Sequence, residues 1–505
     1  MSGTRLLHFG VALSVLNATK TYTGTYGTVY TSVIDAADGI YPAMTNGEPN
    51  GTELDGQYRR AQYPGFISDN PSDSSGGFPA GSEPTLTMNV TGYINGVTLI
   101  FANDEGCAVS VDFINGGTVV GTKTATATGR VLFVSGEGGI TAVKVTFTKT
   151  NAPETYVKVA RFFPGRVTEL TGKEIMTCDA TRECSLGGME LPAGSLSFTV
   201  NSEAPAAFRY RELILAYWNV ELIGHFFVDN VKKAGPGRYS VTAVDAIGVM
   251  ATTPFSGVYM STDTDVELAA ANLVGSTFDV TVEAFHIENV RGIVTATNKR
   301  DALLNFGAGS SLWCAARPAA GAAPSLTAPI TFGDVMTNID PESGTITDLS
   351  PDEIYQDTDV TEQIAVDSLE VISHAFTASA YGTIQIGNSR YNDAVTSTSF
   401  TVGTTPSGLP NVKRIAEALT IITGKKDPTH TEPTDVDLIG KTTAEYLRKT
   451  KRLTLTAANV FVDLGQKLRA TIEGVTYTAA VEKINYRFGA SVIANTYTAV
   501  VLAEE

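Results

Sequence analysis

The chain reads LTMNV at residues 86–90, GVTLIFAN at 96–103, CAVSVDFI at 107–114, RVLFVS at 130–135, ITAVKVTFTK at 140–149 and YVKVARFF at 156–163. Apolar and polar residues alternate in these runs, which predicts half-buried β-strands because successive side chains of a strand point to opposite faces. Turn residues separate the runs, namely Asn95-Gly96, the Asn-Gly-Gly of 115–117 and the GEGG of 136–139. Strands at this spacing predict a jelly-roll β-sandwich over residues 1–165.

The composition of the whole chain supports the same fold class. Of its 505 residues, 43% are hydrophobic and 18% are charged, which indicates a folded chain of several domains. A second β-rich block is expected over residues 166–255, a small α+β insertion over 256–350 and a third β-rich block over 351–505. The predicted class is therefore mainly β.

Two patterns in the second block carry specific expectations. Gly235, Pro236 and Gly237 separate two alternating runs, which predicts a hairpin between those runs. Tyr217 and Trp218 stand in an apolar run and are interpreted as core residues.

Four segments have apolar residues at helical spacing. The segments VELAAANLV (266–274) and NKRDALLNFGAG (298–309) predict helices in the insertion, and the second helix would begin at an Asn298 cap and end near Gly307. The segments LPNVKRIAEALTIITG (409–424) and TTAEYLRKTKR (442–452) predict two more, separated by a solvated linker.

Charge and hydropathy exclude some classes of protein. The net charge of −17 argues against nucleic-acid binding through phosphate contacts, which requires a basic surface. The chain has no run of about 18 apolar residues, so no transmembrane helix is predicted. His8 and Gly10 interrupt the apolar start, which favours a first β-strand over a secretion signal.

Few residues are arranged for chemistry. None of the five histidines lies within four residues of another, and the chain has no nucleophile elbow, P-loop or dinucleotide fingerprint. The best metal candidate is an acidic loop that either binds Ca²⁺ or is simply solvated, and a weaker one is the turn at 69–73. We therefore expect no catalytic residues and no cofactor. The acidic loop contains Asp352, Glu353, Asp357, Asp359 and Glu362.

The four cysteines are Cys107, Cys178, Cys184 and Cys314. The spacing between Cys178 and Cys184 is wrong for a zinc ribbon. Two interpretations stay open for this pair, a short hairpin disulfide or two free thiols.

Three stretches of the first block, 50–69, 94–114 and 151–167, resemble a discoidin-like jelly-roll module at the front of phage and prophage tail proteins. The matching positions are the Leu54-Asp55-Gly56 turn, the strand from Gly96 to Phe101 and the strand from Pro153 to Arg161. The resemblance implies a module that either contacts carbohydrate or only decorates the tail.

Residues 226–250, 256–274 and 289–314 resemble the hub family of phage tail baseplates, and 446–499 is similar to the closing hairpins of that family. The segment from Gly257 to Tyr259 is one residue shorter than the family pattern. The matching positions are Asp245, Gly248, Gly257, Tyr259, Gly292, Arg300, Ala302 and Leu303.

The hub resemblance implies that residues 166–255 and 351–505 form two tube-like β-barrels and that three copies make a ring. Such a protein is a structural, non-enzymatic virion component assembled in the host cytoplasm. The implied partners are a distal tail or tail tube protein on one side and a tail tip, fibre or lytic protein on the other. Phage DNA would pass through the ring without specific binding during genome ejection. Because three copies carry three times the charge of −17, we hypothesise an acidic lumen that repels DNA.

Three alternatives stay open. The first is a sixfold distal tail ring protein with a carrier module. The second is a carbohydrate-binding adhesin for host attachment, with a cell-surface glycan as its partner. The third is an enzyme that acts on glycans or on the cell wall.

Overall fold

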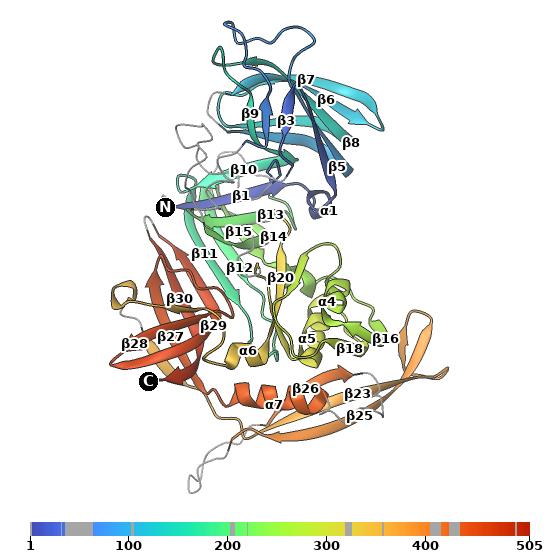
Figure 1. The fold of residues 1–505 in the computed structure, drawn as a ribbon, viewed down its shortest axis with the longest axis vertical. Coiled ribbons are helices and arrows are strands. Elements are labelled where there is room, and N and C mark those ends of the chain that lie inside the picture. The colour runs from blue at the N-terminus through green and yellow to red at the C-terminus, as the bar shows by residue number, and fades with distance from the viewer. Residues whose placement is uncertain are drawn as a thin grey trace.

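The structure is a computed structural model that describes residues 3–31, 33–35, 64–102, 106–201, 208–219, 221–318, 326–355, 358–403, 416–423, 435–489 and 492–505. Strands far outnumber helices, which confirms the mainly β class. The strands form several sheets, of which the two largest have thirteen and eight strands (Figure 1).

The eight-stranded sheet forms the upper part of the molecule in Figure 1, and its apolar core continues through β1 and β13 into the core of the insertion. It is antiparallel in the order β3-β4-β9-β5-β8-β6-β7, with β2 beside β5. Inside it the rings of Phe66 and Phe147 stack with their centroids 5.5 Å apart. The six alternating runs lie mostly within its strands. The strands are β2 (Lys20–Thr25), β3 (Gly27–Val29), β4 (Phe66–Ser68), β5 (Thr85–Phe101), β6 (Cys107–Asn115), β7 (Thr118–Thr126), β8 (Val131–Thr150) and β9 (Lys158–Pro164).

Two of the three predicted turns in this sheet are wrong. Both Asn95-Gly96 and the GEGG of 136–139 lie inside long strands, β5 and β8, whose pairing register shifts there. Gly136 is needed at this irregular point because a Cβ on it would lie 2.4 Å from Ile140 Cδ1. The predicted turn at 115–117 is confirmed, since it joins β6 to β7 with positive φ at Gly116 and Gly117.

The thirteen-stranded sheet joins the two blocks that were expected to be separate barrels. Its order is β10-β1-β13-β14-β15-β12-β11-β29-β30-β27-β22, with β28 and β21 branching from β29. Among the described residues no sheet closes into a barrel. The strands are β1 (Thr4–Gly10), β10 (Arg166–Thr171), β11 (Ile175–Glu183), β12 (Ser195–Asn201), β13 (Leu213–Trp218), β14 (Glu221–Gly235), β15 (Arg238–Val244), β21 (Ile346–Asp348), β22 (Asp359–Glu362), β27 (Lys451–Ala458), β28 (Lys467–Ile472), β29 (Val475–Phe488) and β30 (Ile493–Glu504).

Three expectations can be compared with this sheet. The apolar start does form a strand, β1, but β1 pairs with β10 and β13 and not with the first module. The side chains on both faces of β1 are buried. The sequence pattern of this strand alone therefore does not indicate which sheet it joins. The hairpin at 235–237 is confirmed between β14 and β15. Tyr217 and Trp218 are buried, and the Trp218 ring meets Phe488 of β29 edge-on at 6.2 Å.

The predicted α+β insertion packs against the first half of this sheet. It holds the two-stranded sheet β16-β18 and the three-stranded sheet β17-β20-β19. Both predicted helices are present, and the Asn298 side chain caps the second by accepting from Asp301 N, but that helix continues past Gly307 to a left-handed Ser311. The elements are α3 (Ala246–Ala251), β16 (Val258–Asp265), α4 (Val266–Val274), β17 (Asp279–Val282), β18 (Asn289–Val294), α5 (Lys299–Ser310), β19 (Leu312–Ala315), β20 (Pro329–Asp334) and α6 (Val335–Ile339).

A four-stranded sheet, β24-β25-β23-β26, extends along the base of Figure 1, and α7 packs against β23 and β25. The helix predicted at 409–424 is wrong, because residues 416–423 form β26, parallel to β23. An apolar run such as Leu419 to Ile422 suits a strand as well as a helix. The helix predicted at 442–452 begins earlier and ends at Leu447. The elements are β23 (Ser368–Ala378), β24 (Ile384–Ile386), β25 (Ser389–Thr401), β26 (Ala416–Thr423) and α7 (Asp435–Leu447); two short helices, α1 (Leu13–Leu16) and η2 (Pro351–Glu353), lie elsewhere.

Candidate functional site

One face of the thirteen-stranded sheet carries rows of small polar side chains across β15, β12, β11, β29, β30 and β27. Directly paired residues of antiparallel strands point to the same side, so the register defines these rows. One row is Ser195, Thr181, Asn485, Thr496 and Thr456, each paired with the next. We call this surface the polar face. Its further members are Ser197, Thr199, Ser240, Thr242, Thr177, Asp179, Glu183, Lys483, Arg487, Thr498 and Thr454.

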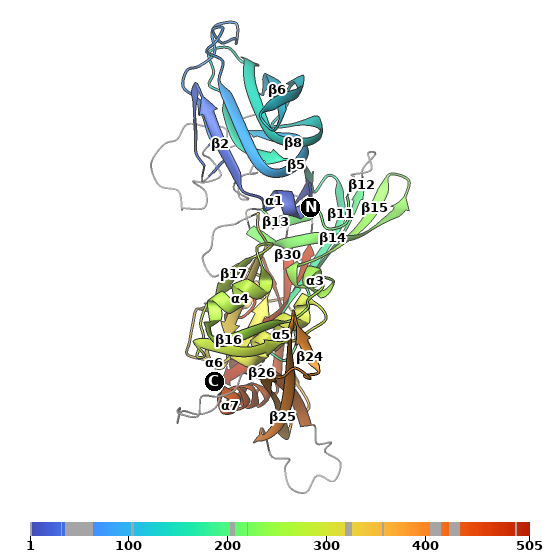
Figure 2. The same cartoon turned by 90° about the vertical axis from the view of Figure 1, so that its right-hand side faces the viewer.

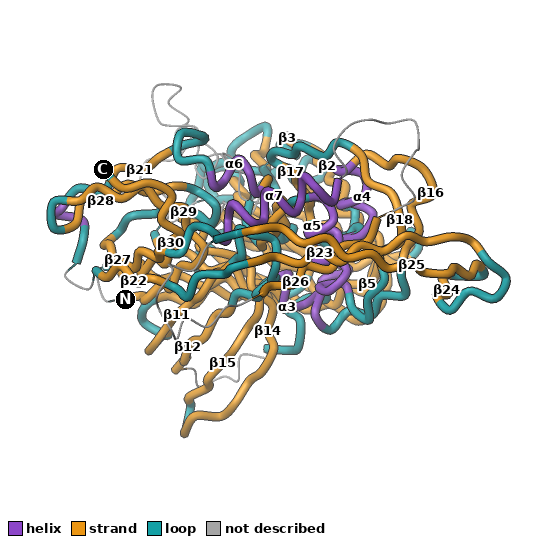
Figure 3. Tube along the Cα trace, turned by 90° about the horizontal axis from the view of Figure 1, so that it is seen from below, coloured by secondary structure: helices purple, strands orange, loops and turns teal. Residues whose placement is uncertain are grey.

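The polar face is solvent-accessible in the chain as it stands. Ser195, Ser197 and Thr242 are exposed, while Thr181 and Thr496 are half-buried between their neighbours. Seen from below, β12, β14 and β15 extend away from the helices (Figure 3), and a view from the side shows the same projection (Figure 2). The opposite face of these strands is apolar and belongs to one core cluster.

Three pairs of side chains interact with each other on the polar face. Thr181 Oγ1 donates to Asn485 Oδ1 at 2.9 Å, and the hydroxyls of Thr456 and Thr496 lie 2.8 Å apart. The few charges present include Lys483 and Glu183, which form an ion pair at 2.9 Å. The polar face therefore has many hydrogen-bonding groups but a nearly balanced charge.

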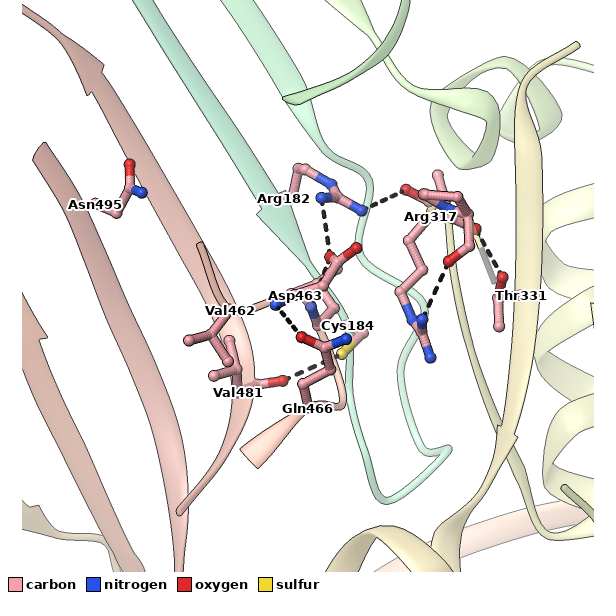
Figure 4. A network of polar contacts seen from close by, with 12 residues as sticks. Arg182, Cys184, Arg317, Thr331, Val462, Asp463, Gln466, Val481 and Asn495 are labelled. Carbon is pink, nitrogen blue, oxygen red and sulfur yellow. Dashed lines mark hydrogen bonds and ion pairs between the residues drawn. The ribbon is translucent and has the colours of Figure 1, made fainter. Parts of the chain in front are cut away.

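A buried ion pair lies behind this face, where the two halves of the sheet meet. Arg182 is the second-last residue of β11 and lies on its apolar side, and its Nη1 is 2.9 Å from Asp463 Oδ1 in the β27–β28 connection (Figure 4). Its Nη2 also donates to the carbonyl oxygen of Ala316, 3.3 Å away in the insertion. Burial alone would lower the pKa of Arg182, but Asp463 raises it above its ordinary value. Arg182 thus connects three segments that are distant in sequence.

A second buried pair lies near the first. Glu482 is the extra residue of a bulge in β29, between Val481 and Lys483. Its Oε2 lies 3.1 Å from Arg452 Nε, and its Oε1 accepts from the Tyr446 hydroxyl at 2.5 Å. Burial raises the pKa of Glu482, and Arg452 opposes that rise. This cluster holds α7 against β27 and β29.

A third charged contact fastens the insertion. Arg317 pairs with Glu283 and lies over the Trp313 ring, 5.1 Å from its centroid. The Thr331 hydroxyl donates to the carbonyl oxygen of Arg317 at 2.6 Å (Figure 4). These contacts join β17, β19 and β20 into one unit.

Asp245 occupies a buried position at the start of α3. Its Oδ1 accepts from Gly248 N at 2.9 Å, and its Oδ2 accepts from Gly194 N at 2.7 Å. Burial raises the pKa of Asp245 to about 6, although these backbone hydrogen bonds favour the charged form. This residue matched the hub pattern in the sequence, and its role here is that of a helix cap.

The histidines are dispersed through the fold. His8 pairs with Glu212 at 2.7 Å, His286 with Asp334 at 2.9 Å and His374 with Asp393 at 2.8 Å. The Asp334 carboxylate also caps α6 by accepting a hydrogen bond from Thr337 N, so it has a structural role. His225 borders a cavity with room for about one water molecule beside Arg182. His430 lies outside the described residues.

The predicted metal candidates do not converge. Over the part of the chain that the structure describes, no group of three potential metal ligands is present. Glu353 receives hydrogen bonds from the backbone and hydroxyl of Ser350, while Asp359 and Glu362 lie in β22. Asp357 lies outside the described residues. In the second candidate Asp73 stabilises its own turn by accepting from Ser75 and Gly77, which lowers its pKa.

All four cysteines are free and buried. Cys178 lies in β11 and Cys184 directly follows that strand, so they are separated by about 20 Å of extended chain. A bridge between them is therefore excluded in this structure. Burial raises the pKa of Cys107 to about 12 and that of Cys184 well above its ordinary value, which opposes thiolate chemistry.

The polar face has a signal in the sequence, which is Ser or Thr at the polar positions of alternating strands. In SLSFTV (195–200), LTLTAA (453–458) and TYTAVV (496–501) the polar positions are mostly Ser or Thr. The buried ion pair has no such signal in the sequence, because Arg182 meets Asp463 and the Ala316 carbonyl only in the folded chain. Among the described residues, no helix is both long and apolar enough to cross a membrane.

Comparisons with known proteins give remote likenesses. No family model matches the chain, and no curated protein matches it. A tail protein from Neisseria meningitidis MC58 is similar with a TM-score of 0.42 and 11% identity, covering 67% of this chain and 94% of its own. The 43 kDa tail protein of prophage MuSo2 from Shewanella oneidensis follows with 0.41 and 10%, covering 66% and 96%. A prophage tail protein from Listeria monocytogenes EGD-e gives 0.40 and 10%, covering 66% and 91%. None of these likenesses assigns the chain to a family.

Replacing Asp463 with Ala is expected to lower the free energy of unfolding by about 3 kcal/mol, because Arg182 is left buried without its carboxylate. Replacing both partners, as Arg182→Met with Asp463→Leu, should restore most of that loss. Urea unfolding followed by circular dichroism measures both. The control is Asp348→Ala, which breaks an exposed pair with Arg469 and should cost less than about 1 kcal/mol. Equal losses in Asp463→Ala and Asp348→Ala would contradict the assignment.

Asp245 should make stability depend on pH between about 4 and 6. Its pKa is higher in the folded chain than in the unfolded chain, so its favourable contribution is complete at low pH and declines as pH rises to about 6. Asp245→Asn cannot titrate, so its stability relative to the parent should rise by roughly 2 kcal/mol from pH 4 to pH 7. Unfolding curves of both proteins at each pH measure this. Parallel pH profiles of the two proteins are the outcome that would refute it.

Proposed function

We propose that this chain is a structural virion protein, the baseplate hub at the tip of a phage tail, in which several copies form a ring around a passage. The observation that carries the proposal is the polar face, which crosses both halves of the thirteen-stranded sheet without interruption. The resemblance of three collinear sequence segments to tail hubs points in the same direction.

The polar face has few groups that would bind a DNA strand moving along it. Its Ser and Thr side chains are short, and Thr181, Thr456 and Thr496 are hydrogen-bonded to neighbours on the same face, so the face offers no long side chains to grip a ligand. Phosphate retention requires clustered Lys or Arg, and the cations present have acidic neighbours: Lys483 pairs with Glu183, and Arg487 stands opposite Asp179. A passage lined in this way would let DNA through without binding it.

This chemistry changes the hypothesis of an acidic lumen. The net charge of −17 is distributed over the whole chain, while the polar face carries nearly balanced charges. If the polar face lines the passage, DNA slides because the wall lacks binding groups. Repulsion by the distant acidic residues would be a weaker, salt-dependent addition.

The buried ion pairs would keep the elements of one copy in fixed positions within an assembly. Arg182 connects β11 to the β27–β28 connection and to the insertion, Arg452 joins β27 to β29 beside α7, and Arg317 joins two segments of the insertion. They fix the insertion and α7 against the sheet, so that a ring contact on one element is transmitted to the others. We assign no catalytic residues. The partners in this proposal are other copies of the chain, a tail tube or distal tail protein, and a tip protein.

The purified full-length protein should form a particle with three times the 53.3 kDa mass of one chain and threefold symmetry. Native mass spectrometry and end-on electron microscopy measure the two properties. A sixfold particle would favour the alternative of a distal tail ring. A chain that stays monomeric at all concentrations and binds glycans through residues 1–165 would replace the proposal with an adhesin.

A cysteine at Ser197 should report which surface the ring encloses. Because the native cysteines are buried, Ser197→Cys adds the one readily accessible thiol of the described chain. In the assembled ring it should react with N-ethylmaleimide but be protected from a maleimide carrying a bulky polyethylene glycol chain. Ser82→Cys, on an exposed loop of the first module, is the control and should react with both reagents. Equal reaction of both variants with the bulky reagent would place the polar face outside the ring.

A further inference from the structure

The polar face ends on one side at the tip of the β14–β15 hairpin. From Asn230 onward β14 pairs only with β15 among the described strands, so this part of the hairpin is a lateral end of the sheet. Lys232 is paired with Ser240, and Arg238 lies two residues before Ser240, so both cations point to the polar face. Both are exposed, as is Lys233 beside them. We call these three cations the basic end.

On its other side the polar face ends at the outer edge of β27. Residues 354 and 355, and after them β22, lie along that edge. Asp359 is paired with Thr454 of the polar face, so its carboxylate points to that face. Asp352 and Glu362 flank it in the sequence, and all three carboxylates are exposed. We call them the acidic end.

Neither end is neutralised by its own chain. The three cations of the basic end form no ion pair with another described residue, and the same holds for Asp352 and Asp359. Glu362 stands opposite Lys451, but that lysine already pairs with Glu504 at 2.7 Å. The two lateral ends of one face therefore carry opposite, uncompensated charges.

We propose that the basic end of one copy docks on the acidic end of the next copy, so that salt bridges join neighbouring copies around the ring. The inference rests on the proposed function and deepens it by naming the surfaces that close the ring. When identical copies enclose a passage with the same face, one end of that face meets the opposite end of its neighbour. Such a contact is head-to-tail and has no two-fold axis, which suits a closed particle of three copies. Opposite charges at the two ends make every one of these contacts attractive.

The same contact completes the wall of the passage. Lys483 and Arg487 have acidic neighbours in their own chain, whereas the residues paired with Lys232 and Arg238 are uncharged. Carboxylates of the next copy would occupy these two cations, so that they no longer attract phosphate groups. The contact joins side chains and needs no strand pairing, which agrees with the short, charged β22 at the acidic end.

The experiment is a charge swap in the full-length protein. Lys232→Glu with Arg238→Glu reverses the basic end, and Asp352→Lys with Asp359→Lys reverses the acidic end. Each double variant places like charges at every contact, so native mass spectrometry should show at least ten times less three-copy particle than for the parent. The chain with all four changes has complementary ends again and should recover the ring.

Three controls accompany the swap. Lys149→Glu with Lys441→Glu changes the net charge as much as the basic-end variant does, at exposed positions of the first module and of α7, and should leave the ring intact. Unchanged thermal melting shows that the variants are folded. The four-change chain mixed with the parent should form separate rings, because every mixed ring contains a contact between like charges.

The outcomes separate this inference from the proposed function. A threefold parent ring that both double variants still form overturns the contact and leaves the ring standing. Loss of the ring in both double variants without recovery in the four-change chain overturns the assignment of the two ends to each other. A parent that stays monomeric at all concentrations overturns the ring and the contact together. A basic-end variant that keeps the ring but loses the parent's binding of a short DNA duplex would assign the basic end to phosphate instead.

Discussion

Strands β11 and β29 belong to opposite ends of the chain, with Thr181 and Asn485 separated by 304 residues, yet their five residue pairs turn two groups of strands into one sheet. The pairing also fixes which way the side chains of both groups point. A shift by one residue would exchange the two faces, placing Ala180 and Tyr486 in water and the hydroxyls in the core. The apolar cluster behind the sheet and the polar face in front of it therefore depend on this single register.

The ionic contacts of the interior are best understood as positional devices. A buried ion pair gains little net stability over an apolar pair of the same shape, because both charges lose their water. What it contributes is selectivity, since the Nη1 and Nη2 atoms of Arg182 have these partners only when Asp463 and the Ala316 carbonyl are both in place. Glu482 has the same property toward Arg452 and Tyr446. The insertion and α7 are consequently held in one arrangement, which a part that repeats in an assembly requires.

Local sequence patterns predicted strands better than turns. The alternation in residues 86–163 located β5 to β9, and the glycines at 235 and 237 located a hairpin, whereas the turns expected at 95–96 and 136–139 lie inside strands. The patterns failed where the answer depends on distant partners. Residues 4–10 alternate like any strand, but only their pairing with Leu213 to Trp218 shows which sheet they join. The run at 419–422 became a strand because β23 was available beside it, which its own residues do not reveal.

The site was predictable to a smaller degree, for a similar reason. The histidines that are separated in the sequence also stay separated in the described fold, where His8, His286 and His374 each pair with a different carboxylate. The polar face is visible in sequence as hydroxyl residues at alternate positions, but its continuity across six strands exists only through the register. Asp245 matched a family pattern and proved to be a buried cap, so a matching residue need not be a site residue.

The open edges of the two large sheets differ, and the difference bears on how copies could meet. Edge strand β22 has only four residues and carries Asp359 and Glu362, so its charges oppose pairing with another strand. Edge strand β7 has nine residues, but its register against β6 shifts at Val120, a bulge of the kind that protects sheet edges. Both edges are thus protected against further strand pairing, β22 by its short length and its carboxylates and β7 by its bulge. Copies of the chain that met at either edge would have to do so through side-chain surfaces.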